Sequence, residues 1–177
     1  MPETDMVLVG RVRRGDLNAY GAIIARHQGR LHAAARHLLG EEEAARDAVQ
    51  ETFIEAYRHL DQLRDPSRLG SWLYGILRHR AFAWLASRRP TVSWDEEGAE
   101  EWYRADGPEE RMDPTALLAR LPDDDRDVLA ARYLLELSYD EIAALLKISN
   151  QAARVRVCRA KGRLRALLAG AEKEVEP

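Results

Sequence analysis

The stretch from Leu137 to Leu168 constrains the fold more than any other part of the chain, because two helix starts lie close together in it. Ser138 lies three residues before Glu141, the spacing of a capping box, in which a hydroxyl and a carboxylate bind free N–H groups of the first turn. Ser149 can cap a second helix after a short break. A short helix, a tight turn and a longer helix together predict a helix-turn-helix.

The second of these predicted helices combines an apolar stripe with a high density of cations. Small and apolar residues recur every three or four positions and indicate a core-facing stripe of Ala153, Val157, Ala160, Leu164 and Leu167. Positions off the stripe hold Arg154, Arg156, Arg159, Lys161, Arg163 and Arg165. No acidic residue occurs between Ile142 and Ala171, whereas an ordinary surface helix mixes charge signs. We therefore interpret this helix as one that enters the major groove of DNA.

Composition limits the classes of protein that this chain can form. Hydrophobic residues make up 46% and charged residues 32% of the 177 residues, which predicts a globular core and argues against wholesale disorder. The single cysteine, Cys158, excludes an internal disulfide and a cysteine-cluster metal site and fits a reducing compartment. No run approaches the ~18 apolar residues of a membrane span, and the first residues show no signal-peptide pattern. We expect a cytoplasmic protein that does not contact a membrane.

Three helices are predicted in the first sixty residues, over residues 5–15, 16–40 and 41–60. In the third, apolar residues recur at helical spacing and indicate a buried stripe of Ala45, Val49, Phe53, Ala56 and Leu60. The polar positions Asp47, Gln50, Glu51 and Arg58 lie off that stripe. Pro66 then disfavours helix at Asp65, so the segment around it is predicted to be a loop, with Ser67 capping the next helix.

The fourth predicted helix, over residues 68–88, is both aromatic and cationic. It contains Trp72, Tyr74, Phe82 and Trp84 among the cations Arg68, Arg78, Arg80 and Arg88, and Arg89 follows it. No acidic residue occurs between Pro66 and Trp94. Aromatic rings that stack on bases beside arginines that hold phosphates suit single-stranded or partly melted nucleic acid. The alternative is that Trp72 and Leu73 simply belong to the core.

A change of composition divides the chain into two domains. Residues 91–113 are acidic, and Gly98, Gly107 and Pro108 break any periodicity in them, which predicts a linker between an N-terminal domain over 1–90 and a C-terminal domain over 114–171. Such a linker is either solvated and extended or mimics a nucleic-acid strand inside a basic channel of a partner. Further helices are predicted near 116–121 and 123–136, and a frayed tail over 172–177. The predicted fold is all-α: two small helical domains joined by an acidic linker, the second with the helix-turn-helix.

Four motifs, in order, resemble those of bacterial RNA polymerase sigma factors of the extracytoplasmic-function (ECF) type. They are D-A-V-Q-E-T-F (Asp47–Phe53), S-W-L-Y-G-I-L-R-H-R (Ser71–Arg80), L-P-D-D-D-R-D-V-L (Leu121–Leu129) followed by L-S-Y-D-E-I-A (Leu137–Ala143), and I-S-N-Q-A-A-R-V-R-V-C-R-A-K (Ile148–Lys161). The resemblance extends from about Asp16 to Leu168. It implies two all-α domains that bind the minus-ten and minus-thirty-five promoter elements, and a linker directed towards the RNA channel of the polymerase.

The resemblance also implies partners and site residues. The partners are core RNA polymerase, through its beta-prime clamp helices and beta subunit, promoter DNA as duplex and as melted non-template strand, and, as a candidate, an anti-sigma protein. Polymerase-binding residues would be Asp47, Gln50, Glu51 and Phe53. Minus-ten residues would be Asp61, Arg64, Arg68, Ser71, Trp72, Arg78, His79 and Arg80, with a flipped base received by the loop over 61–71. Minus-thirty-five residues would be Ser149, Asn150, Gln151, Arg154, Arg156 and Arg159. Of these, Asn150, Gln151 and Arg154 would reach base edges, because Asn and Gln pair with adenine and Arg with guanine, whereas Arg156 and Arg159 would hold phosphates.

The chain departs from the family pattern at positions that bear on promoter sequence. His79 replaces the usual asparagine of the melting helix, and Ala83 replaces a frequent aspartate. The usual glycine-threonine-valine of the recognition helix is Gln151–Ala152–Ala153. Cys158 lies on the same helix, and a buried, inert thiol is favoured there over one that alters DNA binding when modified.

Two other classes of protein are consistent with parts of the sequence. The first is an autonomous helix-turn-helix regulator with an N-terminal sensing or dimerising domain, although such a domain has no need of the basic aromatic helix. The second is a metal-dependent helical-bundle enzyme, because Glu51, Glu55 and His59 follow one another at four-residue steps. Di-metal bundles use paired Glu-x-x-His motifs, which are missing from this sequence. We therefore expect no enzymatic activity, no metal and no cofactor.

Overall fold

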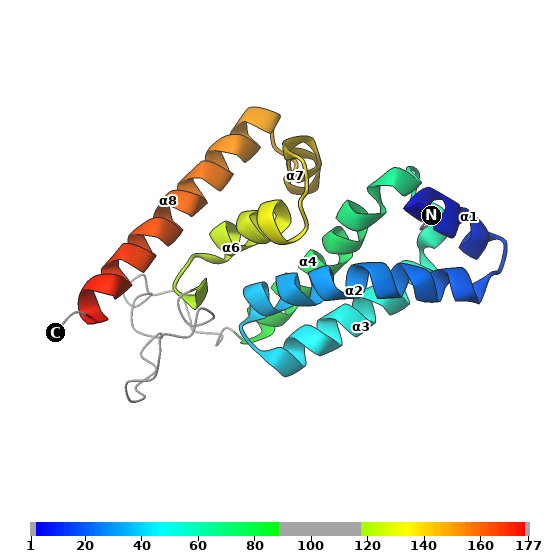
Figure 1. The fold of residues 1–177 in the computed structure, drawn as a ribbon, viewed down its shortest axis with the longest axis horizontal. Helices are drawn as coiled ribbons and strands as arrows, with labels where there is room; N and C mark the ends of the chain where they lie inside the picture. Colours follow the sequence, from blue (N-terminus) through cyan, green and yellow to red (C-terminus); the bar gives the residue numbers. More distant parts are fainter. Residues whose placement is uncertain (1–2, 89–117, 176–177) are drawn as a thin grey trace.

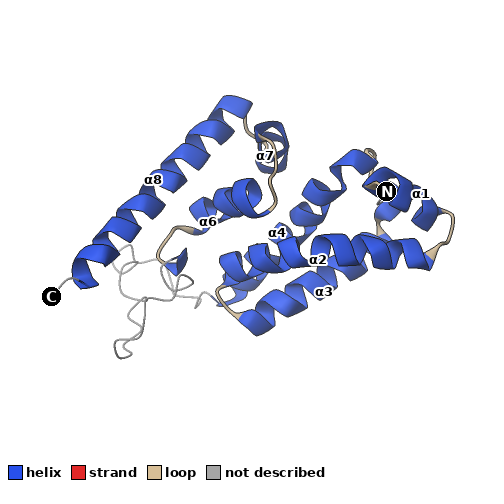
Figure 2. Ribbon diagram, viewed as in Figure 1, coloured by secondary structure: helices blue, strands red, loops and turns tan. Residues whose placement is uncertain are grey.

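The computed structural model describes residues 3–88 and 118–175, with side chains up to residue 170. Within these ranges every regular element is a helix or a helical turn, so the described part of the chain is all-α, as predicted (Figure 2). The predicted acidic linker over 91–113, its proposed strand mimicry and both of its boundaries lie outside the described residues. No helix in the described ranges is long and apolar enough to span a bilayer.

The N-terminal domain consists of α1 (Asp5–Arg13), α2 (Leu17–Leu39), α3 (Glu42–Arg58) and α4 (Leu69–Arg88), with short turns η1 (Leu60–Gln62) and η2 (Pro66–Arg68) between α3 and α4. Helices α2 and α3 lie side by side, and α4 packs across both (Figure 1). The bounds of α2 follow from its caps: the side chain of Asp16 accepts hydrogen bonds from two backbone N–H groups, and Gly40 ends the helix at a φ of 70°.

The predicted apolar stripe of α3 is confirmed, because its five members are all buried against α2 and α4. Another prediction for this domain is wrong. Ser67 does not cap α4; Asp65 caps η2 instead, and its carboxylate accepts hydrogen bonds from both the N–H and the hydroxyl of Ser67.

The C-terminal domain consists of α6 (Asp123–Leu129), η3 (Ala130–Leu134), α7 (Tyr139–Leu146) and α8 (Asn150–Val175). The helix predicted over 123–136 ends early: η3 is a wider, π-helical turn, and Glu136 adopts a φ of 57°. The capping box is confirmed, because the Ser138 N–H donates to Glu141 Oε2 at 2.9 Å and the Glu141 N–H donates to Ser138 Oγ at 3.2 Å.

The turn between α7 and α8 gives the helix-turn-helix predicted from the sequence. Lys147 ends α7 at a φ of 54°, and Ser149 Oγ accepts a hydrogen bond from the Ala152 N–H at 3.1 Å at the start of α8. Helix α8 continues to Val175, into the segment predicted to be a frayed tail. Its predicted core stripe is buried at Ala153, Val157 and Ala160 and half-buried at the two leucines beyond them.

The two domains pack directly against each other. Helix α2 contacts η3 and α6, and α4 contacts α7 (Figure 1). His37 of α2 donates from Nε2 to the backbone carbonyl of Arg126 at 2.9 Å, and Arg30 forms an exposed ion pair with Glu136 at 3.2 Å. The buried apolar residues of both domains therefore belong to one core cluster.

A pH dependence is expected at this contact, because burial lowers the pKa of His37 below its usual value of 6.5. The unfolded chain binds this proton more readily, so the stability that neutral His37 provides is present above about pH 6.5 and is lost as the pH falls below it. The melting temperature of wild type relative to His37→Gln should therefore decrease between pH 7.5 and 5.5 in thermal denaturation followed by circular dichroism. A constant difference over that range would contradict the prediction.

Candidate nucleic-acid and polymerase interfaces

The N-terminal half of α8 presents a polar, cationic surface on a rigid support. Gln151, Arg154, Arg156 and Arg159 are exposed, and Asn150 is half-exposed, at the end of the helix that follows the tight turn. On the opposite side of the same helix, Ala153 and Ala160 are fully buried, so close packing fixes the orientation of the exposed side chains. Four of the predicted minus-thirty-five residues, Ser149, Gln151, Arg156 and Arg159, line a shallow hollow of about 390 Å³, whereas Asn150 and Arg154 lie outside it.

Two of these predicted base readers are held by side chains of α7. Arg154 donates from Nε to Asn150 Oδ1 at 2.8 Å, and Asn150 donates from Nδ2 to Asp140 Oδ1 at 2.7 Å. The Arg154 guanidinium also lies 4.6 Å from the centre of the Tyr139 ring. Sequence reasoning missed the positioning roles of Tyr139 and Asp140, because no local pattern shows that α7 supports these two residues.

Cys158 corrects an expectation from the sequence, because its thiol is exposed and not buried. It directly follows the buried Val157, so it is turned away from the core on the helix.

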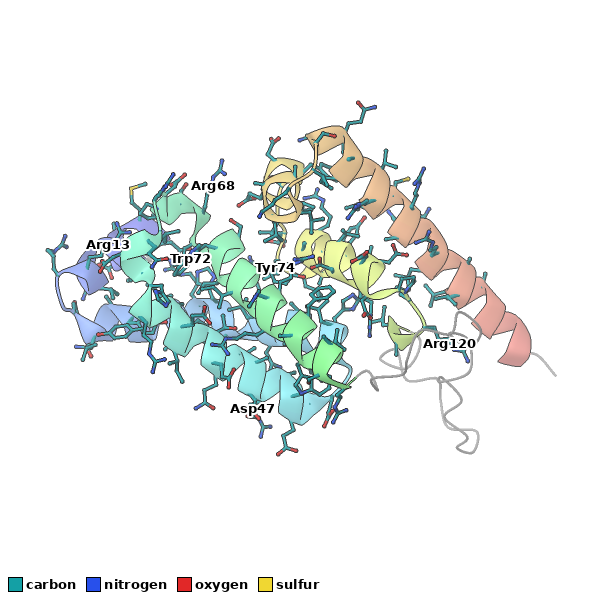
Figure 3. The ribbon with its side chains drawn as sticks, turned by 180° about the vertical axis from the view of Figure 1, so that it is seen from behind. Arg13, Asp47, Arg68, Trp72, Tyr74 and Arg120 are labelled. Carbon is teal, nitrogen blue, oxygen red and sulfur yellow. The ribbon has the colours of Figure 1, made fainter. Side chains whose placement is uncertain are left out.

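The predicted minus-ten loop is fixed by hydrogen bonds from α1 and from within the loop. Arg13 of α1 donates from Nη2 to the backbone carbonyls of Leu60 and Leu63, at 3.0 and 2.5 Å. The Ser71 hydroxyl donates to the carbonyl of Arg68 at 3.0 Å. Arg13 was not among the predicted site residues, since only the fold brings α1 beside this loop (Figure 3).

A pocket of about 420 Å³ lies between this loop and the C-terminal domain. Its N-terminal lining includes four predicted minus-ten residues: Arg64, Arg68, Ser71 and Trp72. Its other wall is formed by Glu141, Ala144 and Leu145 of α7. Asp61 and His79, also predicted, are exposed but do not line the pocket.

The aromatic residues of α4 differ in how far they could contact a base. Tyr74 is fully buried, so the expectation that the aromatic residues of this helix stack on bases is wrong at this position. Trp72 is half-buried and packs against the core, and Phe82 and Trp84 are also half-buried. The Arg78 guanidinium lies 4.8 Å from the Phe82 ring centre, and that of Arg88 lies 4.3 Å from the Trp84 ring centre.

Two predicted minus-ten arginines are engaged in ion pairs with acidic residues of other helices. Arg78 donates from Nε to Asp127 Oδ2 of α6 at 2.5 Å. Arg80 pairs with Glu51, a predicted polymerase-binding residue, and donates to Glu55 Oε2 from Nε at 3.0 Å and from Nη2 at 2.6 Å. The structure therefore places the predicted polymerase face and the predicted minus-ten face on adjacent sides of α3 and α4.

Asp127 is the most deeply buried carboxylate with a partner from the other domain. Its side chain is only 1% exposed, and it accepts a hydrogen bond at Oδ1 from the Tyr74 hydroxyl at 2.8 Å. Burial raises the pKa of Asp127 above its usual value, while the hydrogen bonds and charge of Arg78 act in the opposite direction. Burial also raises the pKa of Tyr74 well above 10. The contacts of Asp127 with Tyr74 and Arg78 were not predicted from the sequence.

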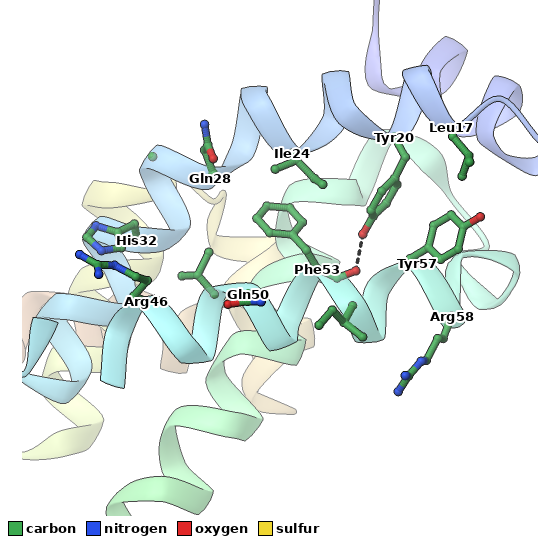
Figure 4. Close-up of a pocket in the computed structure, with 13 residues that line it drawn as sticks. Leu17, Tyr20, Ile24, Gln28, His32, Arg46, Gln50, Phe53, Tyr57 and Arg58 are labelled. Carbon is green, nitrogen blue, oxygen red and sulfur yellow. Dashed lines mark hydrogen bonds between the residues drawn. The ribbon is translucent and has the colours of Figure 1, made fainter. Parts of the chain in front are cut away.

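The predicted polymerase-binding residues lie along the outer side of α3, beside an apolar groove. Asp47, Gln50 and Glu51 are exposed, whereas Phe53 is 6% exposed and forms part of the floor of the groove. The groove runs between α2 and α3 and has a volume of about 930 Å³ (Figure 4). The Tyr20 hydroxyl donates to the backbone carbonyl of Phe53 within it, and burial raises the pKa of Tyr20 to about 12.

Three exposed apolar residues line this groove and were not predicted from the sequence. Leu17 is 65%, Ile54 is 45% and Tyr57 is 46% exposed. A signal was present, because Ile54 and Tyr57 are three residues apart on α3 and lie outside its buried stripe. Apolar side chains gathered on an exposed face are typical of a protein-binding surface.

The five histidines of the sequence show no metal-binding pattern such as H-E-x-x-H. Within residues 3–88 and 118–170 there is no group of three or more His, Cys, Asp or Glu side chains that could hold a metal ion. Of the three residues of the enzyme alternative, Glu51 and Glu55 are paired with Arg80, and the His59 ring contacts the Gln62 side chain.

Comparison with known protein families assigns both domains. The family described as Sigma-70 region 2 matches residues 23–91, and the family described as Sigma-70, region 4 matches residues 115–164. The ECF RNA polymerase sigma-E factor of Salmonella typhimurium is 32% identical over 174 residues, covering 89% of this chain and 91% of that protein. The sigma-E factor of Haemophilus influenzae is 30% identical and covers 89% and 92% of the two chains.

Two solved structures share the arrangement of helices. CnrH, determined in complex with the cytosolic domain of CnrY, has a TM-score of 0.70 and 28% identity, and the match covers 95% of this chain and 99% of CnrH. The sigma factor RpoE of Bartonella quintana, determined with the anti-sigma factor NepR, has a TM-score of 0.67 and 24% identity and covers 85% and 96% of the two chains. At 24% identity, the similarity to RpoE concerns the fold alone.

Two all-α domains, one with a cationic recognition helix and one with a basic loop and an apolar groove, define a two-domain DNA-binding protein of the sigma-70 type. The chain belongs to the extracytoplasmic-function sigma factors of bacterial RNA polymerase. It is a transcription initiation factor that binds core RNA polymerase and directs it to promoters.

Proposed function

We propose that the three surfaces described above divide the work of promoter recognition. The outer side of α3 and the groove beside it bind the polymerase clamp, the loop over 61–71 with α4 binds the melted minus-ten strand, and α8 reads the minus-thirty-five duplex. The observation that carries the proposal is the difference between the two sides of α8. Its exposed side bears arginines, while the residues facing the core are small enough for close packing. A duplex is the partner that such a helix fits.

The polymerase interface is proposed to combine polar contacts with an apolar anchor. Asp47, Gln50 and Glu51 supply exposed acceptors, and Ile54 and Tyr57 supply apolar area beside them. Central apolar and aromatic side chains carry most of the binding free energy in protein interfaces, while surrounding polar groups set register and specificity. Phe53 contributes by shaping the floor of the groove rather than by direct exposure.

At the minus-ten element, the arginines Arg64 and Arg68 are proposed to contact phosphates, since both are exposed beside the pocket. Trp72 lines the same pocket and offers a ring edge or face to an extruded base. Arg78, His79 and Arg80 continue this surface along α4, although the two arginines must first exchange their carboxylate partners for phosphates.

At the minus-thirty-five element, Arg154, Asn150 and Gln151 are proposed to reach base edges, and Arg156, Arg159 and Ser149 to hold phosphates. Arginine pairs with guanine and the amides pair with adenine through two hydrogen bonds each. Fixation of Arg154 by Asn150 and Tyr139 reduces the entropy lost on binding. Gln151–Ala152–Ala153 then presents one long polar side chain, Gln151, at a position where the family usually has a small residue.

We further propose that the protein acts in the cytoplasm without enzymatic activity and that an anti-sigma protein regulates it. The proposed activity rests on surfaces that bind polymerase and DNA and not on a catalysed reaction. Regulation is suggested by CnrH, whose structure was determined with the cytosolic domain of CnrY and which covers 95% of this chain.

The decisive experiment is transcription in vitro with purified core polymerase. The template is a pool of promoter-length DNA in which both elements are randomised, and transcripts are sequenced with and without this protein. Sequence-specific transcripts that need both proteins would support the proposal, and the selected promoter then serves every later assay. Tight, sequence-specific binding to duplex DNA by this protein alone, without transcripts and without binding to core polymerase, would overturn it in favour of an autonomous regulator.

A further inference from the structure

The C-terminal domain covers part of the surface that is proposed to bind the minus-ten strand. Arg78 is directed towards α6, where its Nε lies 2.5 Å from Asp127 Oδ2. The side chain of Arg78 is 29% exposed and that of Asp127 is 1% exposed, so a buried carboxylate occupies the Nε donor of Arg78 and competes with a phosphate for this guanidinium. Arg78, which is proposed to bind DNA, is therefore paired with an acidic residue of the same chain.

A second contact covers the pocket beside the minus-ten loop. Glu141 and Leu145 of α7 form the wall opposite Arg68 and Trp72. A Cβ built on Gly75 of α4 would lie 3.4 Å from Leu145 Cδ1, so the two helices are in van der Waals contact next to this pocket. A carboxylate at this position also opposes a DNA phosphate electrostatically.

The contact has the chemistry of a latch that sets the position of one domain on the other. Asp127 receives hydrogen bonds from Tyr74 and Arg78, which are four residues apart on one face of α4. A buried ion pair adds little net stability, because desolvation of its charges offsets their attraction, but it strongly disfavours arrangements that bury either charge alone. Separation of the domains would return both charged groups to water.

The polymerase face, by contrast, is open in the same arrangement. Asp47 lies on the side of the N-terminal domain away from α7 and α8 (Figure 3). The apolar groove is lined by residues of α2 and α3 alone. The contact between the domains therefore covers the minus-ten surface selectively.

From these observations we propose that Asp127 latches the two domains in a closed state that masks the minus-ten surface, and that opening of this latch permits single-stranded promoter DNA to bind. The inference rests on the proposed minus-ten role of Arg78 and its neighbours. DNA binds only the fraction of molecules that are open, so its apparent affinity falls in proportion to that fraction. Release of the latch should raise the affinity without any new contact to DNA.

The test replaces Asp127 with lysine, which places a cation opposite Arg78, and uses Asp124→Lys as the matched control. Asp124 is exposed on the same helix, so the control reproduces the change in net charge and the loss of an acid near the helix start. Domain separation is measured by energy transfer between a dye on Cys158, which is exposed, and one on an Asn18→Cys substitution. Affinity is measured with a labelled single strand of the selected minus-ten element.

Asp127→Lys is expected to reduce energy transfer and to tighten binding of the single strand by about ten-fold, as for a protein whose open fraction rises from about a tenth to near unity. Asp124→Lys is expected to change neither quantity by more than about two-fold, since an isolated surface charge contributes little. Equal effects of the two substitutions on both quantities would overturn the latch. Failure of wild-type protein to support transcription would count against the proposed function instead.

A covalent test does not depend on the folding of the Asp127 variant. In a chain carrying Gly75→Cys, Leu145→Cys and Cys158→Ser, a short bismaleimide joins α4 to α7 in the closed arrangement. The cross-linked protein should bind core polymerase as before but lose at least about ten-fold of its affinity for the minus-ten strand relative to the same protein before cross-linking. Unchanged affinity for the strand after cross-linking would overturn the inference.

Discussion

Ile54→Asp is expected to weaken binding to core polymerase by about 30-fold or more while leaving the fold intact. Ile54 is 45% exposed at the edge of the groove between α2 and α3, so the free protein exchanges one solvated side chain for another. In the complex, the carboxylate would be buried against an apolar partner, and loss of a central contact of this kind costs about 2 kcal/mol or more. That cost corresponds to about 30-fold in the dissociation constant.

The matched control is Val7→Asp on α1. Val7 is also β-branched and is 46% exposed, but it does not line the groove. Both variants should melt within a few degrees of wild type, because substitutions at exposed sites usually change stability by about 0.5 kcal/mol or less. Affinity is measured by fluorescence anisotropy of labelled protein titrated with core polymerase. A similar loss of affinity in both variants, or none in Ile54→Asp, would remove the groove from the proposed interface.

The result would also separate the groove from the polar residues beside it. Glu51 is paired with Arg80, and its replacement would disturb the adjacent minus-ten surface as well as the polymerase face. Ile54 has no hydrogen-bonding atom in its side chain, so Ile54→Asp leaves the network of Arg80, Glu51 and Glu55 in place. Weakened polymerase binding in Ile54→Asp with unchanged affinity for the minus-ten strand would show that the two surfaces act independently.

The parts of the fold that were predictable are those specified by residues near one another in sequence. The capping box of Ser138 and Glu141 and the apolar stripe of α3 depend on spacings of three and four, and both are present in the structure. The helix predicted over 123–136 was wrong at its end, because the left-handed backbone at Glu136 has no glycine or proline to mark it.

Contacts between distant segments could not be predicted from spacing. Arg78 and Asp127 are 49 positions apart, and a sequence of this kind offers many other acids to any given arginine. The aromatic pattern of α4 indicated base stacking equally at all its rings, yet Tyr74 is fully buried and its hydroxyl donates a hydrogen bond to Asp127 of the other domain. The resemblance assigned Arg78 to DNA, but only the structure shows that another domain occupies it.

Arg154→Ala is expected to reduce affinity for the selected minus-thirty-five element by about 10- to 100-fold, which corresponds to the 1–3 kcal/mol of a two-bond contact with guanine. The same substitution should relax the preference for one base pair, because the other contacts hold phosphates or different bases. Folding should be little affected, since Arg154 is exposed and contacts the ring of Tyr139 and the side chain of Asn150 on the surface. Transcription from the randomised pool by the variant with core polymerase measures the preference directly.

Arg156→Ala is the matched control, because it removes the same guanidinium from an exposed position on the same helix. A phosphate contact carries no sequence information, so Arg156→Ala should weaken binding to all promoters alike and preserve every base preference. It should also reduce the slope of log affinity against log salt by about 0.9. If the base preference is relaxed in Arg156→Ala but unchanged in Arg154→Ala, then Arg156 reads a base and Arg154 holds a phosphate. If the preference is unchanged in both variants, base recognition belongs to Asn150 and Gln151 alone.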